Sequence, residues 1–350
     1  MICSNCTSTP EFLPCVCSVY INTSVDDLFL KIRRLIESYR EIDTIYPDYL
    51  ELQVEDFQTF ICELSLNKNL SNKESSAINV LPLYSNETMS FRTFSNTKPL
   101  SKWISLLKSA ELIYILKNKR LMTYFQPIID VTDNSIYGYE LLIRGLKKDG
   151  TIMPPIEMFD LAGESGLTFN LDRQARETAI ISAARENITE RLFINFLPSV
   201  IYDPNLCLKT TIDLIEKYNF HPHNITFEVV ESEEIQDIDH LIRILDFYRE
   251  RGFRIALDDL GSGYSSLNNL SKLYPDYVKI DMGIIRNIHK DKLRQAIFEA
   301  LVEMAKKSYI CVLAEGVETK EELDFVVSRG ANLVQGYYFC KPSKKPLRIL

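Results

Sequence analysis

The sequence predicts an eight-stranded (β/α)₈ barrel of the TIM type, preceded by a smaller unit of mixed helices and strands. From residue 121 onward, short apolar runs of strand length alternate with amphipathic helical runs. Eight such strands within the last 230 residues suit this barrel, which typically takes about 250 residues. The alternative is a doubly wound open sheet, but no glycine-rich dinucleotide fingerprint follows the first strand.

The first hundred residues lack this alternation. Leu28, Ile32 and Ile36 recur at helical spacing and predict a helix over 28–39. A second helix is expected over 54–64 and a strand over 78–84. We therefore divide the chain into a cysteine-rich segment (1–20), a small regulatory or sensor unit (21–98), a connecting helix that begins at Pro99 (99–120) and the barrel (121–350).

The barrel elements follow in order along the rest of the chain. The predicted strands are 123–125, 139–143, 192–196, 225–229, 254–257, 277–280, 310–314 and 333–335. The predicted helices between them are 172–187, 208–218, 237–251, 291–307 and 320–328. This order, with helices connecting successive strands, is typical of a sheet whose strands run mostly parallel.

Charge and composition exclude several functional classes. The net charge is -8 and the sequence pI is about 5.3, which argues against a broad basic surface for nucleic acid. A small anionic ligand remains compatible if a local site or metal ions compensate its charge. The sequence contains no run of 18 apolar residues and no signal peptide at its start, so we expect a cytoplasmic protein without a membrane span.

Polar side chains lie at the ends of nearly all the predicted barrel strands. They are Glu140, Asn195, Glu228, Asp258, Asp259, Lys279, Asp281, Glu315 and Gln335. Taken singly, each is most simply a solvated loop residue or a helix cap. Active sites of such barrels lie at the carboxyl ends of the strands, however, and this set would share one rim. Its oxygen ligands suit hard cations such as Mg²⁺ or Mn²⁺ better than zinc.

The adjacent carboxylates Asp258 and Asp259 are the least ordinary feature of this rim. They follow a buried-strand pattern and precede a loop that contains Gly261 and Gly263. The pair either points into water or holds a cation, because adjacent like charges at a buried strand end are costly. Successive side chains diverge, so the two could address two ions about 4 Å apart, as in two-metal phosphoryl hydrolysis. Lys279 could orient the attacking water.

Five motifs resemble those of the EAL-domain cyclic di-GMP phosphodiesterases. They are "YGYELLIRG" at 137–145, "DDLGSGYSSL" at 258–267, "VKID" at 278–281, "AEGVET" at 314–319 and "QGYYFCKP" at 335–342. The resemblance extends from about residue 110 to 345. It implies a TIM-type barrel with one antiparallel strand and a homodimer formed through this domain. The signature tripeptide reads Glu-Leu-Leu here where the family has Glu-Ala-Leu, which leaves the ligands in place.

The resemblance also implies roles for individual residues. One ion would be held by Glu140, Asn195, Glu228 and Asp258. Asp258 would be shared with a second ion, which Asp259 and Glu315 would mainly serve. Lys279 would contact the catalytic water. The remaining implied roles are substrate contacts for Gln126, Arg144 and Gln335, support from Asp281, a loop hinged at Gly261 and Gly263, and Glu231 as the residue that fixes this loop.

The function implied is metal-dependent hydrolysis of cyclic di-GMP to pGpG with Mg²⁺ or Mn²⁺, in bacterial signalling that regulates biofilm formation and motility. A non-catalytic receptor for cyclic di-GMP is the alternative. Degenerate receptors usually lack some of the acids, and all are present here. This favours the enzyme.

Four cysteines cluster at the start of the chain, at Cys3, Cys6, Cys15 and Cys17. They could form a Cys₄ zinc site, although the single residue between Cys15 and Cys17 is tighter than usual. A redox switch and unconnected cysteines are the other two interpretations.

Overall fold

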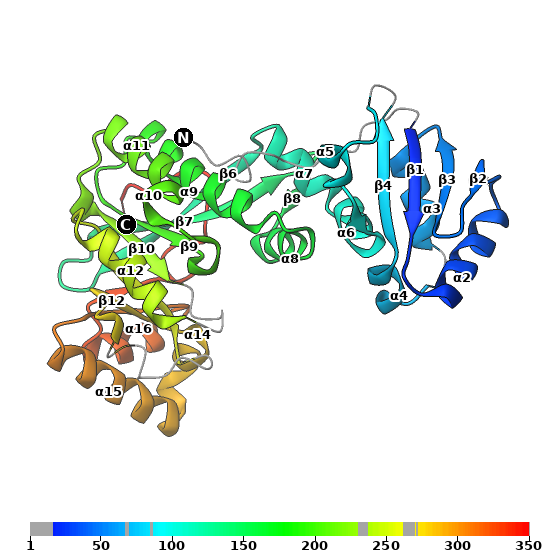
Figure 1. Ribbon diagram of the computed structural model, residues 1–350. Helices are drawn as coiled ribbons and strands as arrows, with labels where there is room; N and C mark the ends of the chain where they lie inside the picture. The colour runs from blue at the N-terminus through cyan, green and yellow to red at the C-terminus, as the bar shows by residue number, and fades with distance from the viewer. Residues whose placement is uncertain are drawn as a thin grey trace.

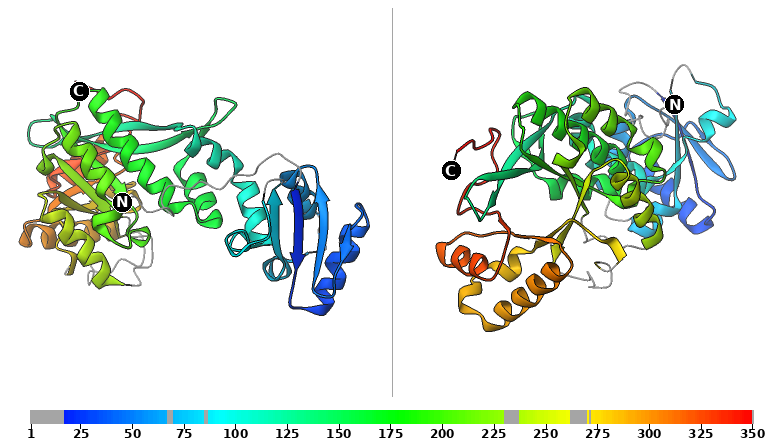
Figure 2. Two further views of the ribbon diagram at one scale, coloured as in Figure 1. Left: turned by 45° about the horizontal axis from the view of Figure 1, so that its top comes forward. Right: turned by 90° about the vertical axis from the view of Figure 1, so that its left-hand side faces the viewer.

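The structure is a computed structural model that describes residues 17–66, 70–84, 87–229, 237–261, 270 and 272–349, with only the main chain at 259. Two sheets organise these residues (Figure 1). Figure 2 shows the smaller sheet at one end and the barrel at the other, with helices between them. Among the described residues, no helix combines the length and the apolar composition that crossing a membrane requires.

The N-terminal part is an antiparallel sheet of five strands in the order β2-β3-β1-β4-β5. The strands are β1 (Cys17–Asn22), β2 (Thr44–Ile45), β3 (Tyr49–Val54), β4 (Asn79–Tyr84) and β5 (Lys98–Pro99). The helices are α2 (Asp26–Glu37), α3 (Phe57–Leu66), α4 (Asn72–Ala77) and α5 (Phe91–Phe94). In β1, Cys17, Val19 and Ile21 alternate with less buried residues, so one sheet face packs against the helices. The predicted helices over 28–39 and 54–64 and the strand over 78–84 are thus confirmed with shifted ends.

The connecting helix differs from its prediction. Residues 99–120 form two helices, α6 (Leu100–Lys108) and α7 (Ala110–Lys117), with Ser109 between them. Ser109 is fully buried, and its hydroxyl donates to the carbonyl of Leu161 at 3.1 Å. Helical spacing continues across this break, so the sequence pattern gave no sign of a contact made with a residue 52 positions away.

The barrel prediction is confirmed. The strands are β6 (Leu121–Asp130), β7 (Ile136–Leu146), β8 (Ile152–Met153), β9 (Arg191–Phe196), β10 (Ile225–Val229), β11 (Arg254–Leu260), β12 (Tyr277–Ile280), β13 (Cys311–Ala314) and β14 (Leu333–Val334). The sheet runs in the order β6-β14-β13-β12-β11-β10-β9-β7-β8, and pairing of β6 with β7 closes it. Strand β6 is antiparallel to both of its neighbours, which confirms one antiparallel strand among the eight that close the barrel; the two-residue β8 is an additional edge strand that pairs antiparallel with β7.

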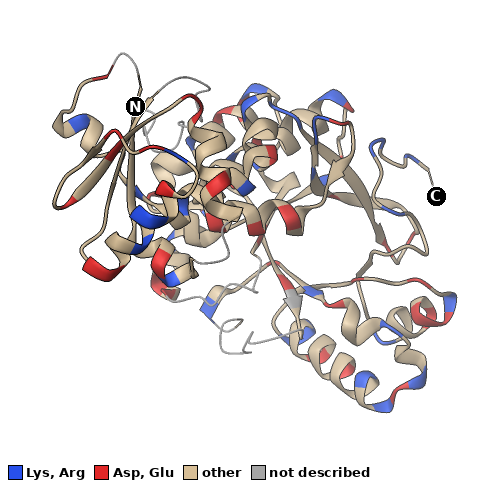
Figure 3. Cartoon of the chain, turned by 90° about the vertical axis from the view of Figure 1, so that its right-hand side faces the viewer, with Lys and Arg blue, Asp and Glu red and all other residues tan. Residues whose placement is uncertain are grey.

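Helices surround the barrel and bury its outer surface. They are α8 (Pro155–Ser165), α9 (Thr168–Arg185), α10 (Pro204–Cys207), α11 (Lys209–Lys217), α12 (Ile238–Arg249), α14 (Met282–Ile285), α15 (Lys292–Lys307) and α16 (Lys320–Ser328), with short 3₁₀ turns at Pro198–Val200, Pro222–Asn224 and Ile288–Lys290. A separate apolar cluster, which includes Phe193, Tyr277 and Leu333, accompanies the main core. Acidic and basic side chains are interspersed along the outer helices (Figure 3).

The two parts share an apolar core through α6, α7 and α8. One buried cluster includes Ile21 of β1, Trp103 of α6 and Met158 of α8. Trp103 packs edge-on against Phe57, and its indole N–H donates to the carbonyl of Val80 at 3.1 Å. The N-terminal sheet is therefore packed continuously, through α6, onto a helix of the barrel.

Candidate active site

Four carboxylates from four different strands surround the ammonium group of Lys279. Nζ lies 2.9 Å from Oε1 of Glu228, 2.9 Å from Oε1 of Glu315, 3.0 Å from Oδ1 of Asp258 and 3.5 Å from Oε1 of Glu140. Each residue sits at or just beyond the strand position predicted for it, so the barrel brings these parts of the sequence together. One positive charge faces four groups that are negative when ionised.

Burial of these groups shifts their pKa values. Lys279 is 1% exposed and Glu228 is fully buried. Burial, together with Glu140 and Asp258, raises the pKa of Glu228 well above its ordinary value despite the opposing effect of Lys279. Burial and the same two neighbours likewise raise the pKa of Glu315. Burial alone would lower the pKa of Lys279, but the four carboxylates outweigh it and raise this pKa well above its usual range.

Two amides hold Glu140 from opposite sides. Nδ2 of Asn195 donates to Oε1 of Glu140 at 3.3 Å, and Nε2 of Gln335 donates to Oε2 at 2.6 Å. Glu140 and Gln335 are 7% and 3% exposed. Parallel pairing places Asn195 directly beside Glu228 on the adjacent strand. The carboxylate of Glu140, the first residue of the signature tripeptide, is therefore fixed in orientation by Asn195 of β9 and by Gln335, which follows β14.

The donor set fits a hard cation. Carboxylate and amide oxygens line the position, and Lys279 supplies the only positive charge that the described contacts bring to the four acids. Nζ of Lys279 lies 2.9 Å from Oε1 of Glu228, whereas Oε2 has no hydrogen-bond partner among the described residues. Within that part of the chain no three acidic, histidine or cysteine groups gather at metal-ligand spacing.

The predicted substrate contacts occupy different places. Gln126 pairs with Glu140 across the β6–β7 hairpin and lines a small polar pocket of about 240 Å³ together with Asp281, Glu315 and Gln335. Arg144 lies four residues further along β7. Its guanidinium donates to the carbonyl of Ile143 at 2.8 Å and lies over the ring of Tyr124. The structure does not bring Arg144 into contact with the acids.

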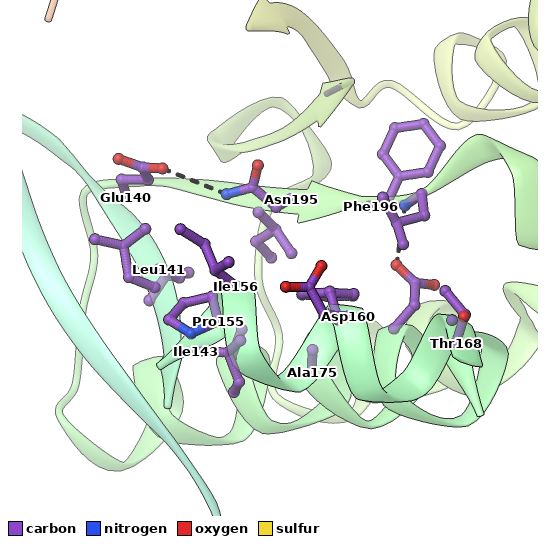
Figure 4. Close-up of a pocket in the computed structure, with 17 residues that line it drawn as sticks. Glu140, Leu141, Ile143, Pro155, Ile156, Asp160, Thr168, Ala175, Asn195 and Phe196 are labelled. Carbon is purple, nitrogen blue, oxygen red and sulfur yellow. Dashed lines mark hydrogen bonds between the residues drawn. The ribbon is translucent and has the colours of Figure 1, made fainter. Parts of the chain in front are cut away.

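A groove next to Glu140 was missed by the sequence analysis. It has a volume of about 570 Å³ and lies between β7, β9 and the helices α8 and α9. Figure 4 shows it extending from Glu140 and Asn195 towards Thr168, with Ile156 along one wall. Most lining residues are apolar, including Leu141, Pro155, Phe159 and Leu197. The prolines that precede α8 mark a helix start, but nothing in the sequence indicated which strands this helix would face.

The supporting residues are only partly described. Asp281 caps α14 by accepting the N–H of Gly283 at 2.8 Å. Gly261 has a φ of +102°, which favours glycine, and a Cβ there would lie 2.3 Å from Cδ1 of Ile284. Asp259 is described in its main chain alone, and Glu231 and Gly263 lie outside the described residues.

The cysteine cluster also falls mostly outside the described part of the chain. Cys3, Cys6 and Cys15 belong to residues that are not described, whereas Cys17 is buried at the start of β1. Cys17 contributes to the apolar core of the N-terminal sheet. Zinc binding and redox switching stay untested.

Comparison with known proteins identifies the barrel. Residues 109–342 match the model of the EAL domain. The probable cyclic di-GMP phosphodiesterase PdeG of Escherichia coli is 33% identical over 233 residues, covering 65% of this chain and 45% of PdeG. This chain thus spans less than half the length of that relative.

Two solved structures share the fold. The cyclic di-GMP-bound form of a standalone EAL protein from Vibrio cholerae superposes with a TM-score of 0.59 at 38% identity, covering 64% of this chain and 93% of that one. The Bacillus subtilis YkuI protein, solved with cyclic di-GMP and calcium, gives a TM-score of 0.58 at 26% identity, covering 67% and 59%. Together with the match over residues 109–342, these similarities show that the chain belongs to the EAL-domain family.

Proposed function

We propose that this protein is a metal-dependent phosphodiesterase that hydrolyses cyclic di-GMP to linear pGpG. The observation that carries the proposal is the ring of four carboxylates around Lys279, directly beside an apolar groove. The volume of the groove, about 570 Å³, is within the range of small-molecule sites. Family membership and relatives named as cyclic di-GMP phosphodiesterases support the choice of substrate.

The residues divide into those that would hold two divalent cations and those that would act on water and substrate. Glu140, Asn195, Glu228 and Asp258 would hold one ion, and Asp259 with Glu315 would mainly hold the other. We propose Mg²⁺ or Mn²⁺ as these ions. When bound, they lower the pKa of water and stabilise the negative charge that develops on the phosphodiester.

The proposed reaction opens the ring at one phosphodiester. Water attacks phosphorus, the bond from phosphorus to the ribose 3′ oxygen breaks, and that oxygen takes up a proton. Lys279 would orient the water through its ammonium group, which the carboxylates hold in place. The groove would receive a planar guanine base, and Gln126, Arg144 and Gln335 would contact the remainder of the substrate.

The rest of the molecule would serve regulation. We propose that the chain has four functional parts: a cysteine-rich segment (1–20), a regulatory unit that contains the N-terminal sheet (21–98), a connecting segment (99–120) and the phosphodiesterase barrel (121–350). The core that this sheet shares with α6 and α8 supports its regulatory role. A homodimer formed through the barrel, a cytoplasmic location and a part in biofilm or motility control belong to the same proposal, as does zinc or redox chemistry at the cysteines.

The test is turnover by the purified full chain. Cyclic di-GMP is incubated with the protein and Mg²⁺ or Mn²⁺, and the products are separated by chromatography. We expect pGpG with either ion and none in a chelator. Tight binding of cyclic di-GMP with no pGpG under any of these conditions would overturn the proposal in favour of a receptor.

A further inference from the structure

The groove has a charged wall residue that the proposed reaction does not use. Asp172 of α9 lines the groove and is 2% exposed. Its Oδ2 accepts hydrogen bonds from Nε and Nη2 of Arg176 at 3.2 and 2.7 Å. Its Oδ1 accepts the main-chain N–H of Leu197 at 2.9 Å. One buried carboxylate thus joins a helix to the chain that leaves β9.

Arg176 also has all of its described hydrogen bonds inside the protein. Its side chain is fully buried, and its third hydrogen bond runs from Nη1 to Oγ1 of Thr211 on α11 at 2.8 Å. A buried ion pair is weak evidence for stability, because an apolar replacement of similar volume is often equally stable. The buried pair of Asp172 and Arg176 is better explained by the position that it gives to the other residue that Asp172 contacts.

The other residue that Asp172 contacts is Leu197, the first residue after β9. Among the described residues, the parallel pairing of β9 with β10 ends at Phe196, opposite Val229. Asn195 is held by that pairing, but Leu197 is not, and Pro198 follows it with no N–H of its own. The bond to Asp172 therefore fixes the course of the chain where Leu197 forms part of the groove wall.

We propose that Asp172 is a positioning residue that sets the shape of the groove by holding Leu197, with Arg176 holding Asp172 in turn. This inference rests on the proposed function, because the groove would receive a guanine base. Asn195 stays in its strand and the acids lie on other strands, so loss of the bond weakens substrate binding more than chemistry.

The experiment compares Asp172→Asn with a matched control. Asp276 makes a comparable set of contacts before β12, accepting one bond from Nη1 of Arg254 at 2.5 Å and one from the N–H of Ile255 at 2.9 Å. It is more exposed than Asp172 and lies at the amino end of its strand, away from the acids. Asp276→Asn therefore perturbs an aspartate, arginine and main-chain contact outside the groove.

We expect Asp172→Asn to raise KM for cyclic di-GMP by about fivefold or more and to change kcat by less than about twofold, a pattern of lost binding in both ground and transition states. Asp276→Asn should leave both constants within about twofold. Unchanged KM in a folded Asp172→Asn protein would overturn the proposal, and so would an equal rise in the control.

A second variant guards against misfolding. Asp172→Asn alone leaves Arg176 as a buried charge without its partner, which can unfold the protein. The double variant D172L/R176M removes both charges and leaves no acceptor for the N–H of Leu197, and apolar replacement of a buried ion pair is often neutral for stability. It should fold and show the same rise in KM; a KM equal to that of the unmodified protein would contradict the proposal.

Hydrogen exchange separates this inference from the proposed function. In the full chain without substrate, the peptide that contains Leu197 should exchange its amide faster in D172L/R176M than in the unmodified protein or in Asp276→Asn. Faster exchange combined with no turnover by the unmodified protein would refute the phosphodiesterase while supporting the contact. Unchanged exchange would refute the positioning role of Asp172, whatever the turnover.

Discussion

The N-terminal sheet and the barrel differ in the kinds of side chain that they bury. Among the described residues of the sheet unit, the buried polar side chains are Thr23, Ser75 and Thr93, all uncharged. The barrel buries charged groups: Glu140, Asp172, Arg176, Glu228, Asp258, Lys279 and Glu322. Burying a charge is costly, so a concentration of buried charged groups points to a function there, although Glu322 has a structural role as part of the capping box of α16. The comparison locates the chemistry in the barrel and leaves the sheet with an ordinary apolar core.

The largest expected effect concerns Glu140. Glu140→Ala removes the carboxylate that Asn195 and Gln335 hold, so we expect turnover of cyclic di-GMP to fall by at least about a thousandfold, equivalent to about 4 kcal/mol of transition-state stabilisation. Glu51→Ala, which removes a carboxylate bonded to Tyr20 in the N-terminal sheet, should leave the rate within about twofold. Initial rates of pGpG formation measure both. Normal turnover by Glu140→Ala would show that the site is misassigned.

The next effect tests the balance of charge around Lys279. Lys279→Met leaves four carboxylates without their ammonium, so in a chelator we expect the free energy of unfolding to fall by about 3–5 kcal/mol, as when one partner of a buried pair is removed. Added Mn²⁺ should raise the melting temperature of this variant more than that of the unmodified protein.

Lys320→Met is the control for Lys279→Met. Lys320 pairs with Asp324 on the surface, where both side chains are more than half exposed, so its loss should be nearly neutral. Thermal unfolding with and without the ion checks the comparison. If Lys279→Met were as stable as the control in chelator, the carboxylates would not depend on the ammonium for compensation.

A third substitution tests the apolar core of the sheet unit. Phe60 of α3 is fully buried there, so Phe60→Ala should destabilise this unit by about 3–5 kcal/mol. KM for cyclic di-GMP should stay within about twofold, because Phe60 belongs to the N-terminal sheet unit and does not line the groove. Phe91→Ala, at a side chain that is 93% exposed, should change stability by less than about 0.5 kcal/mol.

Denaturant unfolding and steady-state kinetics measure these two phenylalanine variants. A large change of KM in Phe60→Ala at temperatures where the barrel is folded would show that the sheet acts on the groove through α6 and α8. In that case the N-terminal sheet and the barrel would have to be regarded as functionally coupled.

The smallest effect concerns a helix cap in the sheet unit. Ser71 and Glu74 form a capping box at the start of α4, in which the serine hydroxyl accepts the N–H of Glu74 and the glutamate accepts the N–H of Ser71. Ser71→Ala should cost about 1 kcal/mol. Ser76→Ala, within the same helix, should cost less because alanine favours helix interiors. Equal losses in denaturant unfolding would mean that the cap contributes little.

Much of the site was predictable because a barrel places the ends of its strands on one rim. Glu228, Asp258 and Glu315 stand at the end of apolar runs, so the alternation of strands and helices was enough to place them together, whereas Glu140 lies near the start of its predicted strand, 139–143, and was indicated by its motif. The motifs added the family, and the comparison with known proteins confirmed it. The sequence spacing did not show whether Arg144 contacts the substrate. Arg144 is four residues from Glu140 along the same strand, and this separation places it well away from Glu140.

The sequence by itself determined the order of elements, the barrel class and the identity of the acids, because these depend on local hydrophobic periodicity and on short motifs. Only the tertiary structure decided that the acids converge on Lys279, that the connecting helix breaks at Ser109 and that Asp172 holds Leu197. Each of these contacts joins residues at least 25 positions apart, except for the pairing of Lys279 with Asp258 on neighbouring strands. Local pattern carries no information on such pairs, because their distance is set by the packing of strands and helices around the barrel.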